Sequence, residues 1–179
     1  TIDVSGNTND GNVTLGAIGQ NLALGGLSVT ADTGNINLNG DIDTTSAGTG
    51  SGDVTFGSNT VLQADRTINT GGGVLDFSAT NVSSSATGPF DLTVNTGGGN
   101  ALLSNFDNAG GRFVNNVVVN TAGGTLQLGG TINLDFDSVN DSEAGSFTLG
   151  GSTSVLVNAN SIVDTEQGDS AAAGDINFG

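Results

Sequence analysis

Several residue types that usually carry structure or chemistry are missing from this sequence. The 179 residues include no cysteine, histidine, lysine, methionine, tryptophan or tyrosine, and a single proline, Pro89. Without cysteine the chain forms no disulfides and no thiolate metal sites. Without histidine or lysine it lacks the usual side chains that act as a base near neutral pH. The common forms of acid–base catalysis and metal catalysis therefore have few residues to draw on.

Positive charge is almost absent. Arg66 and Arg112 face 18 acidic residues, which gives a formal net charge of −16. Nucleic acid is excluded as a partner, because neutralising phosphates requires lysine and arginine. Binding to an anionic membrane surface is disfavoured for the same reason, and no apolar run approaches the roughly 18 residues that span a bilayer. The acidic residues are nearly all aspartate, which fits either turn chemistry and solubility or calcium binding.

Glycine is abundant, with 31 residues, and it opens a six-residue phrase that recurs along the chain. In each copy glycine is followed by a small or polar residue, an apolar residue, a usually polar residue, a second apolar residue and a turn-forming residue. The leading glycines are separated by 23, 18, 21, 26, 25, 21 and 29 residues. Such self-similarity indicates a repeat architecture. The copies begin at Gly11, Gly34, Gly52, Gly73, Gly99, Gly124, Gly145 and Gly174.

The third and fifth positions of the phrase are apolar in all eight copies, whereas the fourth is mostly polar. This alternation predicts a short strand with positions three and five facing inward. We expect these positions to stack in two continuous columns, with the flanking glycines at corners that need a positive φ. The third-position column is Val13, Ile36, Val54, Leu75, Ala101, Leu126, Phe147 and Ile176, and the fifth is Leu15, Leu38, Phe56, Phe77, Leu103, Leu128, Leu149 and Phe178.

Each repeat holds about three short strands, as in 54–56, 60–62 and 67–69, and we expect strands at 22–24 and 27–30 as well. No window has the spacing of an amphipathic helix. A meander or sandwich also has frequent turns, but here the phrase returns every third strand, which favours a parallel β-helix with one rung per repeat. The prediction is an all-β solenoid of about seven to eight rungs over residues 1–179, with no helical domain and loops at 83–89 and 164–173. Its length is roughly 35–40 Å at a strand spacing of about 4.8 Å.

The phrases at 52–57 and 34–39, together with the Asn-Thr-Gly-Gly-Gly closings that end at Gly73 and Gly99, resemble the repeat regions of large bacterial surface exoproteins. These are filamentous-haemagglutinin-type proteins, autotransporter passengers and β-strand-repeat adhesins. The resemblance covers most of the chain. It implies a secreted right-handed β-helix, in line with the preference for right-handed parallel crossovers, which forms an adhesin stalk or a surface fibre outside the cell. It implies no catalytic residues.

Both ends of the sequence read as partial rungs. Residues 1–4 suit the last strand of a rung, and residues 174–179 suit the first strand of another. Open ends of a solenoid invite strand pairing. We therefore expect either an excerpt of a longer repeat array or copies that stack end to end into a fibre. The expected partners are neighbouring repeats or copies of the chain itself, together with glycans or proteins of a host or surface.

An enzyme acting on acidic polysaccharides is the rival class. Such chemistry needs paired carboxylates or calcium with an arginine, and the pairs Asp41 with Asp43 and Asp135 with Asp137 have the spacing to share a strand face. A solvated face explains the same spacing, and the acidic surface would repel an acidic polymer. A threonine face that binds ice is a third class: Thr14, Thr55 and Thr148 share one position of the phrase, although other residues interrupt their column.

The sharpest candidate for a bound ion is calcium in the acidic loop that follows residue 134. Five oxygen donors lie within nine residues there, at spacings that let a loop wrap a hard cation. The match to an EF-hand loop is poor, since the sixth position is not glycine. The candidate ligands are Asp135, Asp137, Asn140, Asp141 and Glu143.

Calcium removal tests this loop. If the five oxygen donors hold calcium, a chelator is expected to disorder the rods or fibres that the protein forms, because the acidic side chains then repel one another without the cation. Electron microscopy of the native material with and without the chelator checks this. Particles of unchanged order after chelation would contradict a structural calcium ion at this loop.

Overall fold

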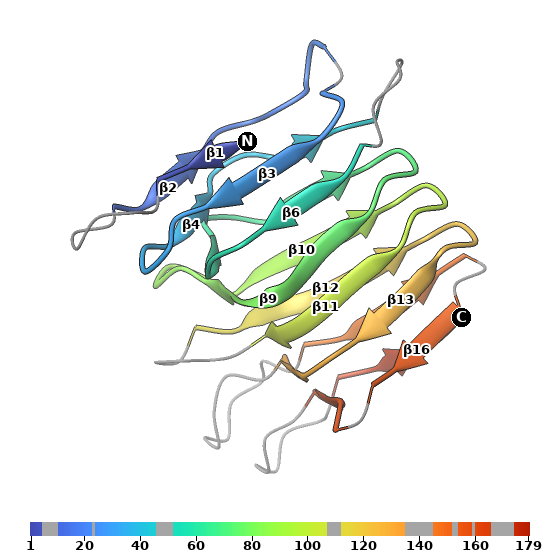
Figure 1. Cartoon of the computed structure of the whole chain (residues 1–179). Helices are drawn as coiled ribbons and strands as arrows, with labels where there is room; N and C mark the ends of the chain where they lie inside the picture. Colours follow the sequence, from blue (N-terminus) through green and yellow to red (C-terminus); the bar gives the residue numbers. More distant parts are fainter. Residues whose placement is uncertain are drawn as a thin grey trace.

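The structure is a computed structural model that describes residues 1–4, 11–22, 24–45, 52–106, 112–134, 145–151, 154–158, 160–165 and 174–179. Across these ranges the chain is an all-β parallel solenoid of about five turns, without a helix. Every strand pairing is parallel. The prediction of an all-β parallel solenoid is confirmed (Figure 1).

Each turn contributes strands to three ladders that run along the solenoid. The first ladder contains β1 (Ile2–Asp3), β3 (Leu27–Thr30), β6 (Val54–Phe56), the start of β9 (Leu75–Ser84), the start of β11 (Ala101–Phe106), β13 (Thr125–Leu128) and β16 (Ser154–Val157). The second contains β2 (Val13–Leu15), β4 (Ile36–Leu38), β7 (Thr60–Leu62), the ends of β9 and β11, β14 (Thr131–Asn133) and β17 (Ile162–Asp164). The third contains β5 (Ile42–Asp43), β8 (Arg66–Asn69), β10 (Phe90–Asn95), β12 (Val114–Asn120), β15 (Phe147–Gly150) and β18 (Ile176–Asn177).

The first two ladders form one sheet, because β9 and β11 run through both of them, and the third ladder is a separate sheet. Partners in neighbouring turns are 21 residues apart at the shortest, Val54 with Leu75, and 31 at the longest, Ile132 with Val163. Turn length therefore varies while the strand register is kept. The extra residues lie at the corners and in the connections between strands, where a solenoid accepts insertions.

The core is the inside of the coil, and it is built by strict alternation along the short strands. In β6, Val54 and Phe56 are buried and Thr55 points outward; the same pattern holds in β2, β4, β13 and β15. Phe56 stacks on Phe77 with ring centroids 4.9 Å apart, and Phe77 meets Phe106 edge to face at 6.5 Å. Aromatic pairs of this geometry add to the burial of their area. The predicted inward direction of positions three and five is confirmed for seven copies; the eighth, at the end of the solenoid, is exposed.

The eight copies of the phrase do not share one pair of columns. Val13 pairs with Ile36, but Ile36 pairs with Thr60 rather than Val54. The copies at 11 and 34 lie in the second ladder, those at 52, 73, 99 and 124 in the first, and those at 145 and 174 in the third. A leading glycine followed by alternating apolar and polar residues suits a strand in any of the three ladders. The phrase therefore recurs along the chain without always occupying the same ladder. β18 accordingly joins the third ladder and β1 the first, although one belongs to a copy of the phrase and the other does not.

Most of the leading glycines are required by close approach between turns. Gly52 has a positive φ of 76°, as predicted. At Gly99 and Gly124 an added Cβ would overlap a glycine carbonyl oxygen of the preceding turn, that of Gly73 or of Gly99. A similar overlap holds at Gly34 against Gly11 and at Gly174 against Gly145. At these four positions glycine lets one turn lie directly on the backbone of the preceding turn, whereas Gly11 has open space at its Cβ position.

Two further expectations are corrected. Leu22 and Leu24 are not in a strand; Leu22 is 84% exposed. The segment predicted as a loop from Ser83 begins later, since Ser83 and Ser84 are the end of β9 and pair with Val61 and Leu62. In both cases pairing with the neighbouring turn, which local sequence does not reveal, decides the outcome.

Replacing Gly124 by alanine tests the role of close approach. The added methyl group would collide with the carbonyl of Gly99, so we expect Gly124→Ala to lower the free energy of unfolding by about 2–3 kcal/mol. Gly11→Ala is the matched control, because Gly11 holds the same place in the phrase with open space around its Cβ position. Urea unfolding measures both variants. Equal losses at the two positions would show that the glycines serve torsion or unfolded-state entropy instead.

Candidate functional site

Side chains on the outside of the coil connect successive turns by hydrogen bonds. In the third ladder the side-chain amide of Asn95 donates from Nδ2 to Oδ1 of Asn69 at 2.8 Å, and Asn120 donates in the same way to Asn95 at 2.8 Å. An amide carries both a donor and an acceptor, so identical residues in consecutive turns can satisfy one another. This asparagine ladder follows directly from parallel, in-register stacking.

Next to it, at the following corner, runs a column of fully buried threonines. Thr44, Thr70, Thr96 and Thr121 are all 0% exposed. Each hydroxyl donates to the carbonyl of the glycine that opens the next strand; the distance is 2.9 Å between Thr121 Oγ1 and Gly124 O. A buried polar group is tolerated only with such a partner. The column explains why the closing phrase contains threonine before its glycines.

The aspartates of the described residues also act between turns. Oδ1 of Asp41, Asp53, Asp65 and Asp91 accepts a backbone N–H from the next turn, at 2.8–3.0 Å. Asp91 accepts two side-chain amides as well, from Asn115 and Asn116. Asp43 and Asp76 instead cap their own chain two residues on. Of these six aspartates, two serve turn chemistry and four form hydrogen bonds between turns, a role that the sequence analysis did not predict.

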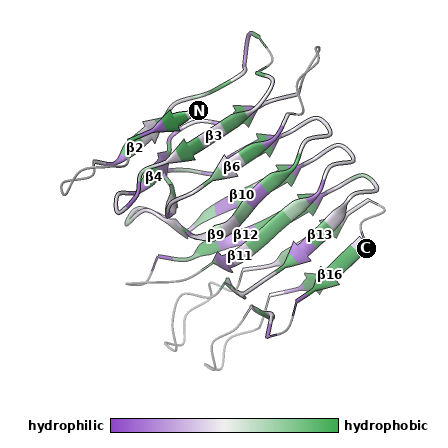
Figure 2. Cartoon of the chain, viewed as in Figure 1, coloured by the Kyte–Doolittle hydropathy of each residue, from purple (hydrophilic) through white to green (hydrophobic). Residues whose placement is uncertain are grey.

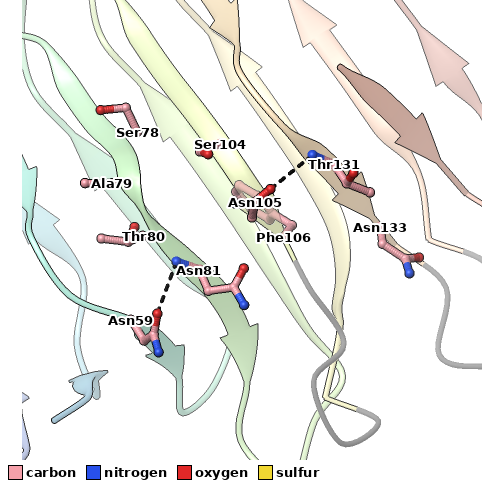
Figure 3. A pocket seen from close by; sticks show the side chains of 10 residues that line it. All are labelled: Asn59, Ser78, Ala79, Thr80, Asn81, Ser104, Asn105, Phe106, Thr131 and Asn133. Carbon is pink, nitrogen blue, oxygen red and sulfur yellow. Dashed lines mark hydrogen bonds between the residues drawn. The ribbon is translucent and has the colours of Figure 1, made fainter. Parts of the chain in front are cut away.

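A polar groove lies across the turns at the corner between the first and second ladders (Figure 3). Its volume is about 700 Å³. The lining residues come from the connection before β7 and from β9, β11 and β14, so the groove crosses four consecutive turns. They are Asn59, Ser78, Ala79, Thr80, Asn81, Ser104, Asn105, Phe106, Thr131 and Asn133.

Unequal corner lengths create this groove. Between the last inward residue of the first ladder and the asparagine that opens the second, β9 has three residues, Ser78, Ala79 and Thr80, whereas β11 has only Ser104. The pairing of β9 with β11 shifts register at this point. The short corner at Ser104 lies beside the longer corner at Ser78 to Thr80. In the next turn, Gly130 lies so close to the Ser104 carbonyl and the Asn105 side chain that a Cβ would not fit. The groove is the space outside the short corner.

Three members of an asparagine column, Asn59, Asn81 and Asn105, line the groove. Asn12, Asn35, Asn59, Asn81 and Asn105 hold equivalent places in five consecutive turns. Where a bond is resolved, the side-chain oxygen accepts a backbone N–H from the next turn: Asn12 from Asn35 at 2.9 Å, Asn59 from Asn81 at 3.4 Å and Asn105 from Thr131 at 3.2 Å. In these three residues the bond holds the side chain against the next turn.

Both ends of the described solenoid expose apolar side chains. Ile2 and Val4 are 37% and 43% exposed at the N-terminal end, and Val157 and Phe178 are 58% and 53% exposed at the other. All four residues of β16 are exposed, and the strand is coloured green, for hydrophobic, beside the C-terminus in Figure 2. Ile2, Val4, Val157 and Phe178 occupy the inward columns that are buried in the middle turns, so each end exposes residues that would belong to the core.

The predicted calcium ligands Asp135, Asp137, Asn140, Asp141 and Glu143 lie outside the described residues, as does most of the predicted loop at 164–173. Among the described residues no group of three or more acidic side chains is placed to hold a metal ion. Asp41 and Asp43 flank the buried Ile42 as their spacing predicts, but each carboxylate is engaged by backbone N–H groups and neither lines the groove.

The threonines considered for an ice-binding face are not in one column. Thr14, Thr55 and Thr148 belong to the second, first and third ladders respectively, so the shared column expected from the phrase is wrong. In the part of the chain that the structure describes, no helix is long and apolar enough to cross a membrane. Comparisons with protein-family models, with curated proteins and with solved structures found no match to this chain.

The asparagine ladder makes a testable contribution to stability. Asn95→Ala removes one hydrogen bond to each neighbouring turn, and we expect it to lower the free energy of unfolding by about 1–2 kcal/mol. Thr93→Ala is the matched control, since Thr93 points to the same side of β10 two residues earlier. Urea unfolding of both variants decides the point; a loss no greater at Asn95 than at Thr93 would show that the ladder contributes nothing beyond the packing of the strand.

Proposed function

We propose that this chain is a structural segment of an extracellular adhesin, a stalk or fibre on a bacterial cell surface. In this proposal the solenoid is a right-handed β-helix of seven to eight rungs, of the kind found in filamentous-haemagglutinin-type proteins, autotransporter passengers and β-strand-repeat adhesins. Its role is mechanical and it catalyses no reaction. The chain is one segment over residues 1–179 of a longer repeat array.

One observation carries the proposal: polar side chains on the outside of the coil bond the next turn. Asn95, Asp91 and Asn105 each link their turn to its neighbour, and Thr96 closes the corner between strands. Together with a core that is continuous through the middle turns, these bonds stabilise a rod without disulfides. A repeat protein built this way gains stability from every neighbouring pair of turns, which suits a part whose function is to span distance.

A second candidate is a fibre of identical copies stacked end to end. The exposed apolar residues at the two ends favour it, because Val157 and Phe178 at one end would continue the inward columns of Ile2 and Ile18 at the other. Open parallel edges also carry unpaired backbone groups that a further turn satisfies. Further repeats of a longer chain would cover the same ends in the stalk.

An enzyme acting on polysaccharides is the remaining alternative, and the groove gives it little support. Its lining consists of amides, hydroxyls, Ala79 and the buried Phe106, without paired carboxylates among the described residues. Glycoside hydrolysis depends on two such carboxyl groups. We therefore propose a surface role with glycans or proteins of a host or surface as partners, and adhesion that resides in the corners and loops of the rod.

Particle shape tests the structural role. Electron microscopy and small-angle X-ray scattering of the purified chain are expected to show single short rods of the same length at every concentration if the segment is a stalk. Long fibres that grow with concentration would support the second candidate. In that case Val157→Asp is expected to break the fibres by placing a charge in the joint, while Leu22→Asp, at the 84% exposed loop residue, leaves them intact. Compact globular particles would contradict both forms.

A further inference from the structure

We propose that the groove at the corner between the first and second ladders binds a linear, uncharged carbohydrate. An adhesive role for this site rests on the proposed function, whereas the binding of the sugar depends only on the groove. The groove has an unbonded hydroxyl, an uncharged polar lining and a length of four turns, which together suit such a ligand.

The unused hydroxyl belongs to Ser104. The residue is 8% exposed and lines the groove. It makes no hydrogen bond with any other residue that the structure describes. Its Oγ is not among the fully buried side-chain atoms that lack a partner, so a molecule in the groove can reach it, and a serine hydroxyl both donates and accepts. A ligand lying in the groove would supply the missing partner at the point where the corner is shortest (Figure 3).

The chemistry of the lining selects the class of ligand. The chain carries a net charge of −16, yet none of the ten lining residues is charged. Hydroxyls of Ser78, Ser104 and Thr131 both donate and accept, and the asparagine amides add donors. A ligand rich in hydroxyl groups matches such a surface, whereas an anionic polymer would meet the acidic surroundings, including the Asp76 carboxylate that accepts the backbone N–H of Ser78 at the edge of the groove.

The shape of the groove favours a chain-like sugar over a peptide. It runs across four turns, which is about 14 Å at the strand spacing, the reach of a short oligosaccharide. Peptides commonly bind by adding a strand to an open edge or by placing apolar side chains in pockets. The strands here are paired on both sides, and Phe106 is 0% exposed and offers no apolar contact. The asparagine column instead repeats its amides once per turn along the groove.

Without an exposed aromatic ring the affinity for a short sugar is expected to be modest, with a Kd of about 1 mM or somewhat tighter. Isothermal titration or NMR titration of the full chain measures it with cello-, xylo-, manno- and maltohexaose as neutral probes. Hexagalacturonate is the charged comparison, and a ten-residue peptide of glycine, serine and asparagine tests the other class. We expect at least one neutral hexaose to bind and the charged sugar and the peptide not to bind.

Three variants locate the binding. Ser104→Ala removes only the unused hydroxyl, and we expect affinity to fall about three- to tenfold with thermal stability unchanged or raised. Ala79→Arg fills the groove from its exposed wall and is expected to abolish detectable binding. Ser28→Ala, at an outward position of β3 away from the groove, leaves binding unchanged. Circular dichroism and scattering on the same samples report whether the rod is intact, which separates this test from that of the structural role.

Several results would overturn the inference. They are an intact rod that binds none of the neutral hexaoses, binding that Ala79→Arg leaves untouched, preferential binding of hexagalacturonate, or binding of the peptide alone. A loss of affinity in Ser104→Ala that comes with a matching loss of stability would assign Ser104 a structural role and would equally count against it.

Discussion

The structure depends on one constraint: each turn lies parallel and in register on the turn before it, at a strand spacing of about 4.8 Å. Each residue must therefore be compatible with the equivalent residue in the neighbouring turn. An inward residue must pack on another inward residue, as Phe77 packs on Phe56. A corner residue must leave room for the backbone of the neighbouring turn, as Gly124 does for the carbonyl of Gly99. A polar side chain finds its partner in its own column, as Asn95 does with Asn69.

This constraint gives the unusual composition a physical reason. Glycine is frequent because close approach recurs at most leading positions, as well as because turns need positive φ. A short side chain that ends in an acceptor, such as asparagine or aspartate, can reach the N–H group of the next turn, as Asp65 reaches Asp91. Four aspartates of the described residues contribute to the acidic charge in this way. Lysine and arginine cannot take that place, since they donate and do not accept.

The same constraint explains where the surface of a regular rod can differ from turn to turn. Strands must keep their register, so variation is confined to corners and connections. The one-residue corner at Ser104 beside the three-residue corner at Ser78 to Thr80 is such a variation, and it leaves a groove lined by uncharged polar groups on an acidic molecule. Specific binding on a repeat scaffold needs only a local break in the repeat of this kind. The ends are the other non-repeating surfaces, and there the exposed core favours contact with further turns.

The sequence by itself determined the secondary structure, the direction of the side chains in most strands and the solenoid class. These follow from alternation, glycine and turn residues, which act over a few neighbouring residues; β6 and β7 could be bounded from such signals alone. Only the tertiary structure decided which ladder each phrase joins, since alternation suits all three corners equally and Ile36 proved to pair with Thr60. It also decided that Leu22 lies outside the strands and that a groove forms at Ser104. Register and corner length are set by pairing with residues 21 to 31 positions away, and a pattern of a few neighbouring residues does not contain that information.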